Sequence, residues 1–377
     1  MLDLQGASAN PLGIILHSWN EIVASANGHI FQTTHWVEVM EALGSKGSAI
    51  PIVMGSDAVM VAYLSSILSA RRIGFSYKSM NVARGPVFRN GAFDASVFER
   101  FMTELDSLAK EHGVITLKIS PQELSSNLAL HAYLTSHGFR RMPDNTGTSL
   151  LHTQTYILSL EGSEDVILSR MMKSTRNCIA KAGRENHVQI EHGTDDEKVR
   201  LFHFPYSRTT PNPASLNFFE TVMAILGRKG LARVFLAKVG NDVAAASFYL
   251  MFGRKIFYVW AGSLRRYNKY APGNLLHWRA IQWAKENGYS LYDFHGAPVD
   301  ENDWPKLPEK MVSTAKFKRG FGGMPVKYIG EYHKAYSRLG SPAGLRFLHE
   351  CARLVRLAHE NRNSVLSRRR AYMPNLP

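Results

Sequence analysis

The sequence is poor in cysteine and has no long apolar run. Its 377 residues include two cysteines, Cys178 and Cys351. Two thiols so far apart in the chain do not indicate a disulfide framework or a metal site, and a reducing cytoplasm is the simpler setting. The most apolar stretch, residues 50–68, is interrupted by Asp57 and by serine and glycine residues, so it falls short of a membrane span. Residues 1–16 lack the basic and apolar regions of a signal peptide.

Acidic residues are scarce in the last sixth of the chain. Residues 310–370 contain 14 Lys and Arg but only three Glu, and this segment accounts for most of the net charge of +14. Such a concentration favours a polyanionic partner, such as RNA, a nucleotide-linked substrate or anionic lipid, over a merely soluble basic tail. Residues 345–370 have the pattern of an amphipathic basic helix, which would bind RNA, touch an anionic membrane or simply pack on the protein.

The composition and length indicate an ordered protein of two domains, since hydrophobic residues make up 45% of the chain and charged residues 20%. The expected elements alternate between helix and strand, and this α/β order restarts after a polar segment at residues 143–153. We expect helices over residues 31–43, 93–112, 126–136, 164–185, 215–227 and 274–287, and strands over residues 49–54, 59–67, 114–119, 155–160, 188–191, 232–239, 243–252, 255–261 and 291–294.

The helix expected over residues 164–185 has two different faces. The apolar face predicts a core contact, and the basic face is either solvated or part of a groove for a polyanion. The apolar positions are Ile167, Leu168, Met171, Met172, Cys178, Ile179 and Ala182, and the basic ones are Arg170, Lys173, Arg176, Lys181 and Arg184.

Seven short motifs, in order between residue 31 and about residue 330, resemble those of one known family. Each alone is weak, and together they are fairly specific for the FemA/FemB/FemX-like (FemABX) aminoacyltransferases. The motifs are FQTTHW at 31–36, RGPV at 84–87, MKSTRN at 172–177 followed by Ile179 and Lys181-Ala182, Leu236-Ala237 with VAA at 243–245, YAP at 270–272 with LLHW at 275–278 and Ala280-Ile281, YDFHG at 292–296, and FKRGFGG at 317–323.

The resemblance implies two tandem acyl-CoA N-acyltransferase (GNAT)-like domains, with mixed sheets flanked by helices, over residues 1–150 and 151–325. It also implies that residues 326–377 return to pack on the first domain. The implied activity is transfer of an amino acid from aminoacyl-tRNA to an amine of a peptidoglycan precursor stem peptide, in cell-wall synthesis. We expect a cytoplasmic monomer that takes a nucleotide- or lipid-linked precursor and contacts anionic membrane at its inner face.

One departure from the family concerns the acceptor. Members that bind the nucleotide-linked precursor often carry a lysine at the end of the first helix motif, and residues 37–40 of this chain have none. A phosphate contact is therefore missing or moved. The acceptor stays open to a small natural-product amine or a polysaccharide-associated substrate.

The implied chemistry is aminolysis of an activated ester, which stores its own energy and requires no cofactor. No P-loop and no His/Cys/Glu cluster at metal-ligand spacing is evident in the sequence. The reaction needs a neutral amine, correct placement and stabilisation of an oxyanion. Lys318, in the matched Phe-Lys motif, is the predicted catalytic cation, with a surface lysine as the alternative. Phe317 would stack on the terminal adenine of the tRNA, and Arg319 would contact the same RNA.

Two other arginines are candidates for substrate binding. Arg208 matches a position where the family places a phosphate-binding arginine, and a guanidinium can grip phosphate with two parallel hydrogen bonds. A helix-end arginine is the alternative interpretation. Arg84, beside Gly85-Pro86, is a weaker candidate with a structural role as its alternative.

Two aromatic and two titratable residues complete the candidate site. Tyr258 and Trp260 would line the acceptor channel, although strand aromatics often belong to a core. Asp293 and His295 follow an expected strand, where sites in α/β folds often lie, and either would help to deprotonate the amine. A turn hydrogen bond is at least as well suited to Asp293.

Two other classes of protein remain open. An acyl-CoA-dependent N-acyltransferase would share the fold, but such enzymes usually cradle the pyrophosphate in a glycine-rich turn before a helix. The nearest candidate, residues 270–274, has one glycine. A non-catalytic RNA-binding module would explain the charge but not the ordered motifs.

Overall fold

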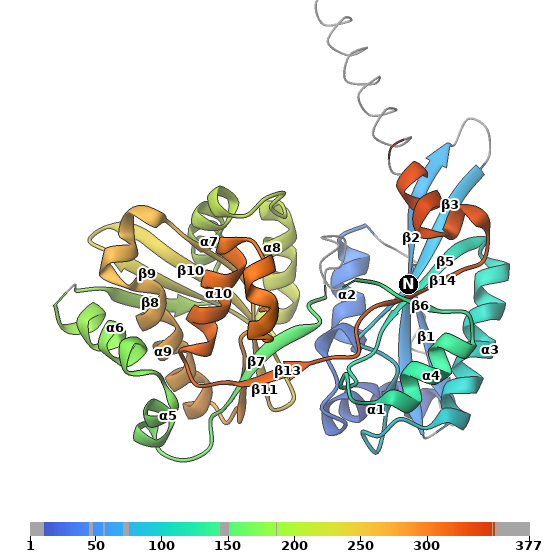
Figure 1. Cartoon of the computed structure of the whole chain (residues 1–377), viewed down its shortest axis with the longest axis horizontal. Coiled ribbons are helices and arrows are strands. Elements are labelled where there is room, and N and C mark those ends of the chain that lie inside the picture. The colour runs from blue at the N-terminus through green and yellow to red at the C-terminus, as the bar shows by residue number, and fades with distance from the viewer. Residues whose placement is uncertain are drawn as a thin grey trace, which may run out of the picture.

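The computed structural model describes residues 11–44, 48–55, 57–70, 75–143, 151–185, 187–348 and 350. They form two mixed β-sheets, each flanked by helices, that lie next to each other with β7 and β13 between them (Figure 1). Within these ranges, no helix combines the length and apolar composition that crossing a membrane requires. Cys178 is a free thiol, and Cys351 lies outside the described residues.

The first sheet has the strand order β1-β2-β3-β5-β14-β6, with β4 paired to β2. Strands β3 and β5 are parallel, whereas the other pairs are antiparallel. The strands are β1 (Ala49–Met54), β2 (Ala58–Ala70), β3 (Phe75–Ala83), β4 (Val87–Phe88), β5 (Val114–Ser120), β6 (Arg140–Arg141) and β14 (Tyr332–Ala335).

The second sheet has the order β13-β7-β12-β11-β10-β9-β8. It repeats the plan of the first, because one adjacent pair, β11 and β12, is parallel and the others are antiparallel. The strands are β7 (Gln154–Ser159), β8 (Gln189–Gly193), β9 (Ala232–Val239), β10 (Asp242–Phe252), β11 (Lys255–Ser263), β12 (Leu291–Asp293) and β13 (Met324–Lys327).

The α-helices agree with the expected ones in part. The sequence reasoning missed α1, α7 and α10, and α7 contains Pro205, an unfavourable residue for a helix interior. The helices are α1 (Pro11–Ser25), α2 (Thr34–Ala42), α3 (Ala95–Glu111), α4 (Leu128–Ser136), α5 (Glu164–Arg170), α6 (Lys173–Arg184), α7 (Asp196–Thr209), α8 (Leu216–Val222), α9 (Pro272–Glu286) and α10 (Glu309–Arg319); a π-helical turn over Met223–Gly227 follows α8, and short 3-10 helices cover Ile30–Gln32, Arg265–Tyr270, Glu301–Lys306 and Arg338–Gly340.

The single helix expected over residues 164–185 is wrong, because α5 and α6 are separate helices. The backbone is extended at Met171 and Met172, and the amide of Met172 donates to the carbonyl of Gly320. Met172, expected on the apolar face, is 51% exposed. No glycine or proline lies at the break between α5 and α6. The break results instead from the contact with Gly320, which is distant in sequence. Of the other predicted apolar positions, Ile167, Met171, Ile179 and Ala182 are buried, and Leu168 and Cys178 are half-buried.

One apolar core joins the two halves of the molecule. It contains Trp19 of α1 and Trp36 of α2 together with Phe202 of α7, Phe219 of α8 and Phe257 of β11. Each fully buried side chain of this size contributes about 1.5–3 kcal/mol relative to an exposed one, so the core holds the sheets in a defined relative position. The C-terminal half of the molecule therefore builds its site on a rigid frame.

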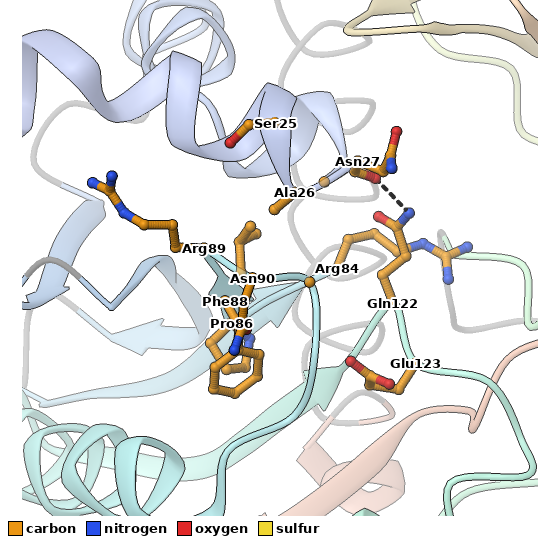
Figure 2. A pocket seen from close by; sticks show the side chains of 13 residues that line it. Ser25, Ala26, Asn27, Arg84, Pro86, Phe88, Arg89, Asn90, Gln122 and Glu123 are labelled. Carbon is orange, nitrogen blue, oxygen red and sulfur yellow. Dashed lines mark hydrogen bonds between the residues drawn. The ribbon is translucent and has the colours of Figure 1, made fainter.

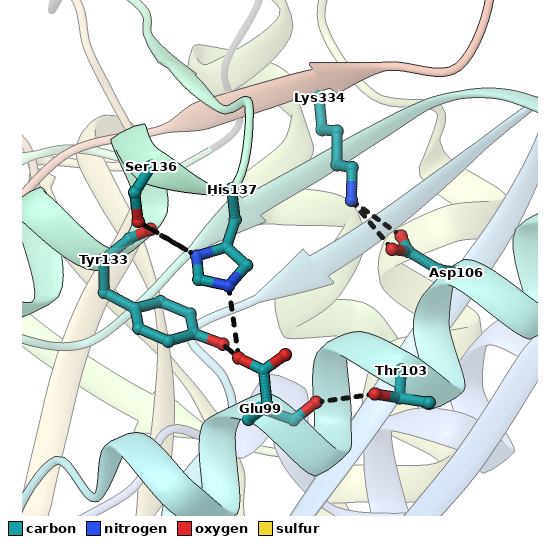
Figure 3. Close-up of polar contacts among 7 residues, drawn as sticks. All are labelled: Glu99, Thr103, Asp106, Tyr133, Ser136, His137 and Lys334. Carbon is teal, nitrogen blue, oxygen red and sulfur yellow. Dashed lines mark hydrogen bonds and ion pairs between the residues drawn. The ribbon is translucent and has the colours of Figure 1, made fainter.

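Strand β14 brings the end of the described chain back to the first sheet. The Nζ of Lys334 donates to both carboxylate oxygens of Asp106 on α3, at 2.9 and 2.8 Å (Figure 3). The hydroxyl of Tyr336 donates to the same carboxylate at 2.5 Å. On the same helix, Glu99 accepts from Tyr133 and pairs with His137. These polar contacts tie α3, α4 and β14 together outside the core.

Replacing Asp106 with asparagine tests this tie. We expect the free energy of unfolding to fall by about 1 kcal/mol, because the partly buried Lys334 loses its counter-ion and the amide has one acceptor oxygen for two donors. Denaturant titration of the purified protein measures the change. Glu104→Gln, at an exposed position of the same helix, is the matched control and should alter stability by less than about 0.5 kcal/mol. Equal effects of the two variants would contradict the assigned role of Asp106.

Candidate functional site

A cavity of about 610 Å³ opens on the second sheet between β10, β11 and the helices α9 and α10. Four groups of lining residues surround it, from the C-terminal end of α7 round to the inner face of α10. They are Thr209–Pro211, then Ala245, Ala246 and Ser247 with Tyr258, Ala261, Gly262 and Ser263, then Arg265, Asn268, Ala271, Pro272, Gly273, Asn274, Leu276 and His277, and finally Lys310, Ser313, Thr314, Phe317 and Lys318.

Strand irregularity shapes the floor of the cavity. Strands β10 and β11 change register between Phe248 and Tyr249, and such a bulge bends a strand and re-aims its side chains. On the adjacent strand, Gly262 allows α7 to approach closely, since a Cβ there would lie 2.3 Å from the carbonyl carbon of Pro205. The cavity therefore depends on local departures from regular strand geometry.

The first turn of α9 forms one wall. Ala271 has a left-handed backbone (φ 52°) and Pro272 occupies the first turn, where its missing N–H costs nothing. The helix N-terminus carries partial positive charge, which favours a phosphate or another anion. Arg265, Lys310 and Lys318 also line the cavity, and none of the described lining residues is acidic. The cavity is thus suited to an anionic ligand.

Lys318 lies at the inner end of the cavity and is 6% exposed. Its Nζ donates to the carbonyl of Gly296 at 2.7 Å and to that of His295. Burial lowers the pKa of Lys318 from 10.5 to about 7, and the carboxylate of Asp293 opposes this shift. The ammonium also stands 5.2 Å from the ring centroid of Tyr258. The Lys318 ammonium is a buried cation that titrates near neutral pH.

A hydrogen-bonded aromatic network supports the same end of the cavity. Nδ1 of His277 lies 2.6 Å from the hydroxyl of Tyr292, which lies 2.8 Å from the hydroxyl of Tyr249. Burial and the neighbouring Lys318 lower the pKa of His277 to about 3, so this imidazole is neutral. Burial raises the pKa of Tyr258 to about 12, so its phenol stays protonated. The sequence reasoning missed His277, although it lies inside the matched motif at residues 275–278.

Three predicted site residues, Lys318, Phe317 and Tyr258, share this cavity. The ring of Phe317 lies 5.4 Å from that of His277 and also faces Gly273, so it has an apolar support on one side. Trp260 does not line the cavity. It is half-buried and packs on the core against Phe218, Phe219 and Phe248.

Two predicted arginines do not line the cavity. Arg319 is exposed and forms a 2.7 Å ion pair with Glu301. Arg208 is exposed, and its guanidinium stands 3.9 Å from the ring centroid of Phe204 on the same helix. Sequence proximity to Lys318 placed Arg319 in the site, but successive helix residues point in directions about 100° apart.

Asp293 and His295 are buried between the sheets and do not line the cavity. Oδ1 of Asp293 accepts from the hydroxyl of Thr155 at 2.6 Å and from the amide of His295 at 2.8 Å, so the carboxylate makes the turn hydrogen bond. The ring of His295 stands 4.8 Å from that of His152. Burial, reinforced by His152, holds the pKa of His295 well below its ordinary value. Neither group reaches a ligand in the cavity as a base.

Arg84 is also buried and belongs to a different cavity. Its Nη2 donates to the carbonyl of His152 at 2.6 Å, and its guanidinium stands 4.4 Å from the ring centroid of Tyr328. These contacts tie the first sheet to the segment that enters the second. Figure 2 shows Arg84 with the other residues of its cavity, which shares no lining residue with the cavity at Lys318.

The fold and the site define a chain of two tandem GNAT-like domains. The model of the acetyltransferase (GNAT) domain matches residues 169–304, which include most of the second sheet. The crystal structure of FemX superposes on this chain with a TM-score of 0.68 at 16% identity, covering 85% of this chain and 96% of that one. The structure of L-PGS from Bacillus licheniformis superposes with a TM-score of 0.52 at 14% identity, over 88% of this chain and 95% of its own.

Sequence relatives point in the same direction. The chain is 23% identical to the UDP-N-acetylmuramoylpentapeptide-lysine N(6)-alanyltransferase of Weissella viridescens, over 82% of this chain and 90% of that protein. It is 25% identical to aminoacyltransferase FemA of Staphylococcus epidermidis over 26% of this chain and 23% of that protein. The predicted resemblance to the FemA/FemB/FemX-like proteins and the predicted tandem fold are confirmed.

Proposed function

We propose that this protein is an aminoacyltransferase that moves an amino acid from aminoacyl-tRNA to an amine of a peptidoglycan precursor stem peptide. The observation that carries the proposal is the cavity at Lys318, which combines three cations, a helix N-terminus and the aromatic ring of Phe317 with no acidic lining residue among those described. The likeness of the chain to the alanyltransferase of Weissella viridescens supports the proposed class of acceptor. We place the reaction in the cytoplasm, where aminoacyl-tRNA is made.

In the proposed reaction the acceptor amine attacks the ester carbonyl carbon of the donor. A C–N bond forms, the carbonyl oxygen becomes an oxyanion, and collapse of the intermediate breaks the C–O bond to the tRNA ribose. The ribose oxygen takes up the proton that the amine releases. In this proposal protonated Lys318 stabilises the oxyanion, and Phe317 stacks on the terminal base, a contact worth about 1–3 kcal/mol.

Acyl-CoA is a less suitable donor for this cavity. The α9 turn that would cradle a pyrophosphate runs Ala271-Pro272-Gly273-Asn274, so it has one glycine, and Pro272 lacks an N–H to donate. A single-stranded RNA end is bound mainly by aromatic side chains that stack on its bases and by cations, rather than by a row of backbone amides. The residues of the cavity therefore favour the tRNA donor.

A transfer assay with two labelled donors tests the proposal. Purified protein is incubated with a peptidoglycan precursor and either a pool of charged tRNAs or labelled acetyl-CoA. We expect label to reach the precursor from one aminoacyl-tRNA and not from acetyl-CoA. Transfer from acetyl-CoA alone would overturn the proposed donor, and transfer to a small amine but not to the precursor would overturn the proposed acceptor.

A further inference from the structure

A second cavity, of about 430 Å³, lies where β3 and β5 of the first sheet end (Figure 2). The turn after α1, the segment that contains the cis Gly85–Pro86 bond and the loop after β5 enclose it. Asn27 and Gln122 face each other across it, and the amide of Gln122 donates to the carbonyl of Asn27 at 3.0 Å. The volume lies in the lower part of the range of small-ligand sites, about 300–1,000 Å³.

One residue that lines this cavity, Arg84, is a buried cation that has no ion-pair partner in the described part of the chain. Arg84 is 5% exposed, and among the described residues its Nε has no hydrogen-bond partner and no carboxylate forms an ion pair with its guanidinium. Lys255 of the second sheet, also buried, donates to the carbonyl of Asn27 at 3.3 Å. A buried cation costs free energy unless an anion or a full set of acceptors surrounds it.

One carboxylate, that of Asp293, lies near enough to raise the pKa of both cations, and it is already engaged by Thr155 and the amide of His295. Burial lowers the pKa of Arg84 and of Lys255 in spite of it. The region therefore has an excess of buried positive charge that the described residues leave uncompensated.

The cavity also offers an unused acceptor. Oε1 of Gln122 is buried and has no hydrogen-bond partner among the described residues. A ligand that completes the site must accept from Arg84 and donate to Gln122. The C-terminal residue of a peptide carries both groups, since its carboxylate accepts and its own amide N–H donates. The apolar side chains of Pro86, Val87 and Phe88 supply a wall for a small side chain.

We propose that this cavity binds the carboxylate end of a short peptide, with Arg84 on the carboxylate and Gln122 on the last peptide N–H. The identification of that peptide as the stem peptide of the acceptor rests on the proposed function, whereas the carboxylate site itself does not. Glu123 lines the mouth of the cavity together with Arg89. Because the negative charge of Glu123 repels a phosphate dianion more than a singly charged carboxylate, the carboxylate is the better ligand for this cavity. A chain of contacts from Arg84 through His152 and His295 leads to Lys318.

Binding of a matched pair of dipeptides to the full-length protein tests the site without tRNA or precursor. The probes are N-acetyl-alanyl-alanine and its C-terminal amide, titrated by calorimetry or ligand-observed NMR. We expect the acid to bind at least about tenfold more tightly than the amide, because the amide has no negative charge to pair with the guanidinium of Arg84. Equal binding, no binding, or displacement by inorganic phosphate at the same concentration as the acid would overturn the proposal.

Two conservative variants at the mouth of the cavity are expected to change the affinity for the acid in opposite directions. Asn90→Asp keeps the oxygen that accepts from the amide of Ala92 and adds a negative charge, so we expect binding of the acid to weaken about fivefold. Glu123→Gln removes a negative charge, and we expect binding to strengthen by a similar factor of about five. Binding of the amide should respond to neither. The same response of both probes would overturn the assignment.

Arg84→Gln tests directly whether the buried guanidinium recognises the carboxylate. It keeps an N–H donor and removes the charge, so the preference for the acid over the amide should fall from about tenfold to about one. This ratio is measured on the folded fraction alone and separates ligand recognition from any loss of stability. A ratio that stays near the wild-type value would sink the proposal. Dipeptide binding without transfer activity would instead count against the proposed function and leave this site standing.

Discussion

Replacing Lys318 with methionine is expected to lower kcat for aminoacyl transfer by about 10²–10³, with little change in KM for the donor. The methionine side chain has a similar length and fills the space of the buried lysine stem, but it cannot donate to an oxyanion. Because the charge develops only in the transition state, its loss should appear in kcat. Steady-state kinetics with one purified aminoacyl-tRNA measure the effect. A rise in KM without a fall in kcat would show that Lys318 binds the donor rather than stabilising the transition state.

The pH dependence of the wild-type enzyme checks the charge state of Lys318. Since its pKa is lowered to about 7, the cation is lost as the pH rises through neutrality, and kcat should fall on that side. A rise of kcat through the same range that vanishes in Lys318→Met would assign the lysine as a base instead. Lys318→Arg, which stays charged, should lack the descending limb near pH 7.

Stability provides a readout of Lys318 that does not depend on activity. Between pH of about 7 and 10.5 the unfolded chain holds a proton on this lysine that the folded protein has released. The free energy of unfolding contributed by Lys318 therefore rises with pH over that window and is flat below it. The difference between wild type and Lys318→Met, followed by denaturant titration at several pH values, should show this slope. A flat difference would contradict the lowered pKa.

Replacing Gly262 with alanine is expected to destabilise the protein by about 3 kcal/mol. A Cβ at this position would lie 2.3 Å from both the carbonyl carbon of Pro205 and the amide nitrogen of Tyr206. Both are backbone atoms of α7, so the contact can be relieved only by moving the helix off the sheet. Gly262 also lines the cavity at Lys318, and we expect transfer activity to fall with stability.

Gly183→Ala is the matched control for this prediction. It lies in α6, and the nearest atoms to a new Cβ, both of Leu275, are 4.0 Å away. Alanine should stabilise the helix by about 0.5–1 kcal/mol through its lower backbone entropy. Denaturant titration of both variants gives the comparison. A Gly262→Ala protein as stable as wild type would show that α7 yields to the added methyl group at little cost.

Elements with strong local signals were predictable from the sequence. The strands expected over residues 49–54 and 232–239 coincide with β1 and β9, and the helix expected over residues 93–112 is α3 with Asp94 as its N-cap. Continuous apolar runs closed by turn residues are properties of neighbouring residues, and such signals do not depend on the rest of the fold. Helix α10, which carries Lys318, was missed because its exposed face is polar and its buried face is narrow.

The membership of the candidate site was predictable only in part. The motif at residues 317–323 pointed to Lys318 and Phe317, which do line the cavity. The same motif gave no reason to separate Arg319 from them or to include His277. Which side chains meet depends on helix rotation and on the packing of α9 and α10 against β10 and β11, and a family motif does not encode these contacts one residue at a time.

By itself, the sequence determined the α/β class, the repeated plan of two halves and the chemical types of residue available to the site. Only the tertiary structure decided that Lys318 is buried beside backbone carbonyls, that Asp293 serves a turn, and that Arg84 is buried with no ion-pair partner among the described residues. The physical reason is that charge state and reactivity follow from burial and from neighbours distant in sequence. Hydrophobic periodicity, by contrast, is a local property that one segment of chain carries alone.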